Sequence, residues 1–200
     1  IGVVSAMTVP SLMQNYQRLS YVTQLHKVYN EFSQALTQYQ TDKNALNLKE
    51  AGLTSQGAVD SFMRNYFKIV QECDSMSNCF ANEYRAINGG VVEGYDSSYN
   101  SFVLANGASV RPTISIEGDK LISMGVDING KKGPNILGRD LFWFVIYSNN
   151  IIDDGQNNKI FSAPLTEEQR ETLFNTYCLN GSNAIGCFGK ILNDNWEMNY

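Results

Sequence analysis

The feature that most limits how this chain can fold is a stretch without glycine or proline between Ser11 and Ala51. Apolar residues recur in it at steps of three and four positions, so they share one face of a helix. They are Leu12, Tyr16, Leu19, Val22, Leu25, Val28, Phe32, Leu36 and Tyr39. The pattern predicts a helix of about 30 residues, which is about 45 Å long. A small globular domain does not need such a length, so part of the helix must extend from the domain or be covered by neighbouring molecules.

The residues at the start of the chain are apolar and uncharged. Ile1–Gln17 contains no charged side chain, and Ile1–Met13 is mostly apolar. A helix that crosses a bilayer needs about 20 apolar residues, so this stretch is too short alone. We expect it to be the second half of a longer hydrophobic segment whose first half precedes Ile1.

The chain as a whole, with 200 residues, has the size and composition of one folded domain, or of one domain with an appendage. Hydrophobic residues make up 43% of the sequence and aromatic residues 12%, which is enough for a core. The net charge of −5, from 20 acidic and 15 basic residues without a basic run, argues against general binding of nucleic acids. We expect an N-terminal assembly or membrane helix over residues 1–50, whose C-terminal half packs on a head over residues 51–200.

Turn and strand patterns predict that the head is α+β. A second helix is expected over residues 56–72, followed by a long polar loop over residues 73–99. Asn106-Gly107 predicts a hairpin, because both residues tolerate positive φ. The long N-terminal helix is expected to pack on an antiparallel meander of about four or five strands. The strands are expected within residues 102–105, 108–110, 113–117, 121–128 and 141–147.

The end of the chain is predicted to contain one short helix and a loop-rich tail. Thr166-Glu167-Glu168-Gln169 matches a capping box, which predicts a helix that begins there and ends near Tyr177. The tail runs from Cys178 to Tyr200 and is expected to be bounded by a disulfide.

The four cysteines form two close pairs, Cys73 with Cys79 and Cys178 with Cys187. Their spacings do not match zinc sites, and an even number favours disulfides and an oxidising compartment. Four cysteines allow three connectivities. The local one is favoured because each pair would close a short polar loop. Free thiols in a cytosolic protein are the alternative.

The best candidate for a bound ion is a turn rich in glycine, proline and oxygen-bearing side chains. Asp127, Asn129, Asn135 and Asp140 lie in it at short spacing, and calcium prefers such ligands. Lys132 occupies the position at which an EF-hand loop needs glycine, so the turn is not an EF-hand. The alternative is a rigid turn in which Asp127 and Asn129 bond to their own backbone.

Residues typical of catalysis are scarce. His26 is the only histidine and lies in the predicted long helix, so no Ser-His-Asp or Cys-His set is expected in the head. Asp153 and Asp154 could lend ligands to a metal, but a solvated turn is favoured for them. The aromatic run at residues 142–144, with Tyr147, could stack on sugars or on single-stranded nucleic acid, but core and interface packing is favoured. We therefore expect that the chain is not an enzyme.

Two blocks of the sequence resemble one family. Residues 1–12, Ile-Gly-Val-Val-Ser-Ala-Met-Thr-Val-Pro-Ser-Leu, resemble the second half of the N-terminal segment of type IV pilins and pseudopilins. Residues 126–135 and 138–142 resemble a block of bacterial proteins identified as prepilin-like or type II secretion proteins, and residues 195–200 are similar to their ending. The family's cleavage motif and docking glutamate would lie upstream of Ile1.

The resemblance implies a structural subunit of a helical filament, a type IV pilus or a related pseudopilus. Its partners would be further copies of the chain, the bacterial inner membrane before assembly, and the pilus or secretion machinery. Its final location would be the cell surface, or the periplasm for a pseudopilus. The residues expected to mediate assembly are Ile1, Val3, Val4, Met7, Val9, Pro10, Leu12, Met13 and Tyr16.

The resemblance also bears on the ion and leaves two rival functions. Some pseudopilins hold calcium in a loop beside the sheet, which supports calcium as a cofactor of the Asp127 turn. One rival is a membrane-anchored module that binds carbohydrate or DNA and does not polymerise, and the other is a hydrolase that uses carboxylates. The genomic sequence upstream of Ile1 would establish the pilin class, and electron microscopy would separate a polymer from a binding module.

Overall fold

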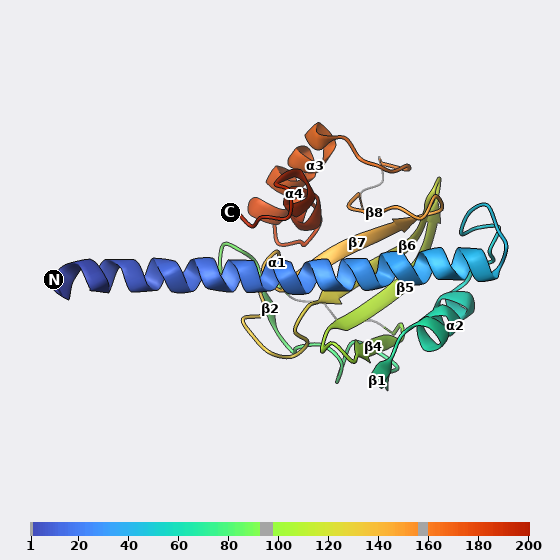
Figure 1. Cartoon of the computed structure of the whole chain (residues 1–200), viewed down its shortest axis with the longest axis horizontal. Helices are drawn as coiled ribbons and strands as arrows, with labels where there is room; N and C mark the ends of the chain where they lie inside the picture. The colour runs from blue at the N-terminus through green and yellow to red at the C-terminus, as the bar shows by residue number, and fades with distance from the viewer. Residues whose placement is uncertain (1, 93–97, 156–159) are drawn as a thin grey trace.

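The computed structural model describes residues 2–92, 98–155 and 160–200, with side chains described from Gln14 onward. Helix α1 (Gly2–Asp42) runs across the head and leads away from it toward the N-terminus (Figure 1). Among its described side chains, from Gln14 onward, the buried ones recur at helical steps, and Val22 is the first of them. They are Val22, Leu25, Val28, Phe32, Ala35, Leu36 and Tyr39. The long amphipathic helix predicted from apolar spacing is therefore confirmed.

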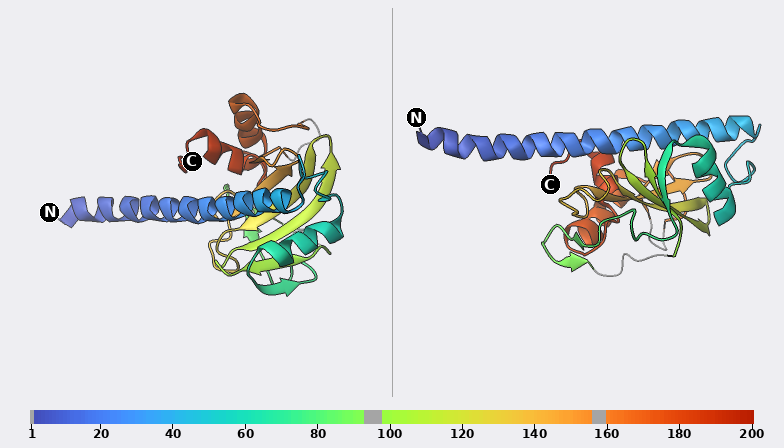
Figure 2. Two further views of the ribbon diagram at one scale, coloured as in Figure 1. Left: turned by 45° about the vertical axis from the view of Figure 1, so that its right-hand side comes forward. Right: turned by 90° about the horizontal axis from the view of Figure 1, so that it is seen from below.

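Six strands form one sheet in the order β1-β4-β5-β6-β7-β8, and every neighbouring pair is antiparallel. Helix α1 lies across one face of this sheet (Figures 1 and 2). The strands are β1 (Ile69–Cys73), β4 (Ser101–Leu104), β5 (Ser109–Glu117), β6 (Lys120–Asp127), β7 (Leu141–Tyr147) and β8 (Ile152–Asp153). The α+β class is confirmed, whereas the sheet has more strands than the four or five expected.

The prediction of a second helix up to residue 72 is wrong at its C-terminal end. Helix α2 (Gln56–Tyr66) ends where Phe67 adopts an extended conformation, and the next residues form edge strand β1. The ring of Phe67 packs on Phe32 of α1, with ring centroids 4.4 Å apart. This contact turns the chain toward β4, where pairing with the sheet replaces further helix. Within the predicted loop, β2 (Tyr84–Arg85) and β3 (Val91–Val92) form a separate two-stranded sheet.

The C-terminal region is more helical than expected. Thr166 caps α3 (Glu167–Leu173) with both hydrogen bonds of a capping box, as predicted. The helix continues as a π-helix, η1 (Phe174–Leu179), and the tail contains a further helix, α4 (Cys187–Asn193). The prediction of a loop-rich tail is therefore wrong for α4. Trp196 then stacks on His26 of α1 with ring centroids 4.0 Å apart, so the only histidine is a packing residue.

Both disulfides join neighbouring cysteines, Cys73 with Cys79 and Cys178 with Cys187, and none of the four is free. The first closes the loop after β1, and the second ties the end of η1 to the start of α4. Gly138 has a φ of +74° and lies against the second disulfide, where an added Cβ would come within 2.8 Å of a Cys187 Sγ atom. The loop between β6 and β7 is thereby held against the C-terminal region.

Candidate cation site

The register of β6 and β7 brings two carboxyl groups of the predicted turn to the same end of the sheet. Asp127, the last residue of β6, pairs with Leu141, the first residue of β7. Asp140 directly precedes Leu141, so the loop between the strands begins and ends beside these two aspartates. Both are fully buried. Asp127 and Asp140 are therefore brought together by strand pairing, not by their distance along the sequence.

Each carboxyl group is held by specific donors. The hydroxyl of Tyr84 donates to Asp127 Oδ2 at 2.5 Å, and the backbone N–H of Asn129 donates to Asp127 Oδ1 at 3.1 Å. The backbone N–H groups of Asn135 and Ile136 donate to the carboxylate of Asp140 at 2.7 and 2.6 Å. These bonds to the loop's own backbone are those of the rigid turn that was the alternative prediction.

Two side-chain oxygens in the same loop are buried without a hydrogen bond. Asn129 Oδ1 and Asn135 Oδ1 have no partner among the residues that the structure describes. The Asn129 side chain nevertheless hydrogen-bonds to Asp140, and its Nδ2 donates to the carbonyl of Gly133 at 3.4 Å. A buried carbonyl oxygen without a donor costs free energy unless something else satisfies it. The four predicted ligands thus lie in one loop, and the side-chain oxygens of the two asparagines accept no hydrogen bond there from the described residues.

Burial dominates the electrostatics of this cluster. It raises the pKa of Asp127 to about 8, with the charge of Asp140 adding to the effect and the Tyr84 hydroxyl opposing it. Burial also raises the pKa of Asp140, against the hydrogen bonds from Ile136 and Asn135. The pKa of Tyr84 is raised by burial and by the nearby Asp127. A proton or a cation is needed for both carboxyl groups to be stable in this position.

The donor set suits a hard cation but not a soft one. It offers two carboxylates and two amide oxygens, without sulfur or imidazole, which is the chemistry that calcium accepts. In the described ranges, no three His, Cys, Asp or Glu side chains are grouped so that they could hold a metal. An ion at this loop would therefore depend on the amide oxygens as well as on Asp127 and Asp140.

The neighbouring acidic pair was predicted as a solvated turn, and that prediction is wrong. Asp153 is buried and forms a two-point ion pair with Arg170, at 2.9 and 2.7 Å. Asp154 is also buried and accepts hydrogen bonds from the backbone of Gly155 and Gly189. Burial raises the pKa of Asp154 to about 6. Both residues thus fasten the helices α3 and α4 to strand β8.

The aromatic run at residues 142–144 does not form a platform of three rings. Phe142 and Phe144 are fully buried in the core, as core packing requires for alternate residues of a strand. Trp143 lies on the opposite face, where its indole N–H donates to Ser123 and the Arg111 guanidinium lies 4.9 Å from its ring centroid.

Tyr84 is the member of the cation site that sequence reasoning missed. It lies in a segment predicted to be a long polar loop, 43 residues before Asp127. Its apolar neighbours offer no periodic pattern. Its position is set by the pairing of β2 with β3 and by the backbone hydrogen bonds of Arg85 with Asn135 and Leu137.

Most of the predicted assembly residues, from Ile1 to Met13, have side chains outside the described part of the chain. Tyr16 is described, and 74% of its surface is exposed. Among the residues that the structure describes, no helical stretch has both the length and the apolarity for crossing a bilayer.

Comparisons with protein-family models, with curated proteins and with solved structures find nothing that matches this chain. The family resemblance of residues 1–12 and 126–142 therefore stays a prediction.

Proposed function

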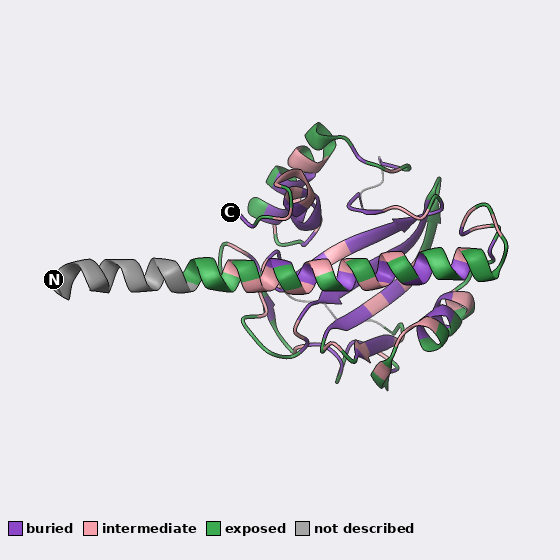
Figure 3. Cartoon of the chain, in the orientation of Figure 1, coloured by how far each residue is buried: buried purple, intermediate pink, exposed green. Residues whose placement is uncertain are grey.

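We propose that this chain is a non-catalytic structural subunit of a helical filament of the type IV pilus or pseudopilus kind. The observation that carries the proposal is the contrast along α1. One face of the helix is buried against the head from Val22 to Tyr39, whereas Tyr16 and Leu19 expose 74% and 65% of their surfaces. Figure 3 shows this change from exposed to buried positions along the helix. Large apolar side chains gain free energy when a neighbour covers them.

Copies of α1 that pack side by side would cover these residues and those of the apolar segment before them. Before assembly, the same segment would lie in the bacterial inner membrane, and the pilus or secretion machinery would move it into the filament. The assembled subunit would be at the cell surface, or in the periplasm for a pseudopilus. Contacts between two different surfaces of identical subunits build an open helix when the rotation does not close a ring.

Electron microscopy of sheared cells that express the full precursor with its assembly machinery tests this proposal. Filaments containing the chain are expected. A Tyr16→Ser and Leu19→Ser variant should give far fewer filaments. The matched control is Gln14→Ser with Gln17→Ser, which changes two exposed polar residues at the same level of the helix. A chain that stays monomeric and membrane-anchored would instead favour the module that binds carbohydrate or DNA.

The proposal includes a calcium ion at the Asp127 loop as a stabiliser of the head. It is supported by the two buried amide oxygens without partners and by the two buried carboxyl groups beside them. Asp127, Asn129, Asn135 and Asp140 would supply the ligands. An ion there would fix the loop that lies between the sheet and the second disulfide.

A further inference from the structure

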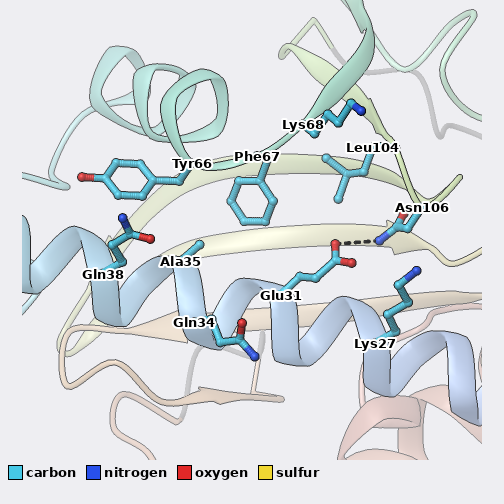
Figure 4. Close-up of a pocket in the computed structure, with 11 residues that line it drawn as sticks. Lys27, Glu31, Gln34, Ala35, Gln38, Tyr66, Phe67, Lys68, Leu104 and Asn106 are labelled. Atoms are coloured by element: carbon cyan, nitrogen blue, oxygen red, sulfur yellow. Dashed lines mark hydrogen bonds between the residues drawn. The ribbon is translucent and has the colours of Figure 1, made fainter.

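A groove of about 430 Å³ lies between α1 on one side and, on the other, the segment from α2 to β1 and the turn that follows β4 (Figure 4). Ala35, Phe67 and Leu104 supply its apolar lining, and Lys27 and Lys68 lie at its rims. Figure 4 shows the two lysines on opposite sides of the groove, one from the helix and one from the segment that leads into β1.

A second hollow of about 570 Å³ extends the groove along α1 toward α2. The two share Gln38 and Tyr66, and the second is also lined by Asp42 and Asn65. Most of the side chains that line them are polar, so the groove suits a polar partner better than a lipid or an apolar helix.

The groove carries a small excess of positive charge, because Lys27, Lys43 and Lys68 line it together with only two carboxylates, those of Glu31 and Asp42. The Glu31 carboxylate accepts a hydrogen bond from Asn106 at 2.8 Å, and the Asp42 carboxylate accepts one from the Tyr66 hydroxyl at 2.8 Å. Lys27 and Lys68 are exposed and form no ion pair with any described residue. A partner that offers carboxylates would therefore find two unpaired ammonium groups.

The opposite flank of the molecule offers such carboxylates. Figure 1 and the left view of Figure 2 show α3 and α4 on one side of α1, and α2 and β1 on the other. Glu167 and Glu168 are exposed and form no ion pair within the described ranges, whereas Glu171 is paired with Lys190. The two flanks of one molecule are therefore complementary in charge.

We propose that the groove receives the first turn of α3 of a second copy of this chain. Glu167 and Glu168 of that turn, called the acidic turn below, would pair with Lys27 and Lys68. This inference rests on the proposed filament function, because it names a contact between neighbouring heads. The contact joins two different surfaces, so each added copy leaves one groove and one acidic turn free for the next. An open helical filament requires a repeating contact of this kind.

Reciprocal charge reversal tests the contact in the full chain. Lys27→Glu with Lys68→Glu makes both flanks acidic, and Glu167→Lys with Glu168→Lys makes both flanks basic. Each exposed ion pair contributes only a few-fold, so either double variant should raise the subunit concentration needed for assembly by about tenfold. The difference from the unaltered chain should shrink in 1 M salt, which screens exposed charges.

Two further experiments test whether assembly is restored when the opposite charges are restored, which would assign the loss of assembly to this contact. A variant with all four reversals has the original net charge and complementary flanks, so it should assemble like the unaltered chain. An equimolar mixture of the two double variants should also form filaments, in which they alternate. In filaments of the unaltered chain, a carbodiimide should link Lys68 or Lys27 of one copy to Glu167 or Glu168 of another.

The outcomes separate this contact from the filament function. If the unaltered chain forms filaments and the double variants assemble equally well, the contact is refuted while the filament function stands. Loss of assembly that neither of the two further experiments restores refutes the pairing of these two surfaces. An absence of filaments from the unaltered chain refutes the filament function and this contact with it.

Discussion

Thermal unfolding with calcium and with EDTA, measured across pH, tests the buried Asp127 cluster. In EDTA, burial keeps the pKa of Asp127 near 8, against an ordinary value of 3.8. Between these values the folded chain binds more protons than the unfolded chain, so its free energy of unfolding falls as the pH rises. The stabilisation is fully present below about pH 4 and is lost as the pH passes 8. Its steepest slope is about 1.4 kcal/mol per pH unit.

Calcium is expected to reverse this trend, because it binds the ionised carboxylate and has to displace the proton. Its apparent affinity should fall about tenfold for each pH unit below 8. At pH 8.5 and a calcium concentration 100 times Kd, the gain is about 2.7 kcal/mol. That corresponds to a rise of about 5–10 °C in Tm for a chain of this size. At pH 6 the same concentration should add less than about 1 kcal/mol.

The variant Asp127→Asn removes the titrating group and keeps the shape of the side chain. It should lose the response to calcium, and its slope in EDTA should be smaller than that of the unaltered chain, most clearly between pH 7 and 8, above the pKa of about 6 of Asp154. The matched control is Asp74→Asn, which changes an exposed carboxylate in the first disulfide loop and should keep both. Equal melting curves with calcium and with EDTA at pH 8.5 would leave Asp127 as a turn residue only. A slope between pH 7 and 8 that is as steep in Asp127→Asn as in the unaltered chain would refute the assignment of the pKa.

Three further outcomes are expected. Removal of residues 1–18, which precede the described buried positions of α1, should leave a soluble, folded monomer, and light scattering that shows aggregates would contradict this. Replacing Cys178 and Cys187 by alanine should lower the free energy of unfolding by about 2–3 kcal/mol, measured with urea. In a filament, residues 2–10 should be at least partly non-helical although α1 is helical there in the single chain, because Pro10 cannot donate to the helix. A filament map with unbroken helix would refute that expectation.

Periodic patterns over long stretches predicted the fold well, and short elements escaped them. The spacing of apolar residues between Val22 and Tyr39 defined α1, and Asn106-Gly107 defined the hairpin of β4 and β5. Strand β8 has only two residues, and Gly186, the cap of α4, has a φ of +83°, which resembles a loop signal. Tertiary contacts determine where such short elements form, and no local sequence pattern predicts these contacts.

The candidate cation site, too, was predictable where local sequence patterns determine it and unpredictable where tertiary contacts do. Asp127 and Asp140 were predictable because turn residues and oxygen ligands lie together in the sequence. The depth of their burial was not predictable, since it comes from the pairing of β6 with β7. Tyr84 hydrogen-bonds to a carboxyl group 43 positions away in the sequence, and Arg170 to one 17 positions away. No local sequence pattern predicts contacts of such separation.

The contact between α1 and the head also has a mechanical consequence. Buried positions of the helix extend from Val22 to Tyr39, about 26 Å along its axis at 1.5 Å per residue. A force that pulls along this axis loads all of these contacts in shear and at the same moment. Peeling would break them one after another, at a much lower force. A head attached in this way should stay on its helix under tension that would unzip a shorter or end-on attachment.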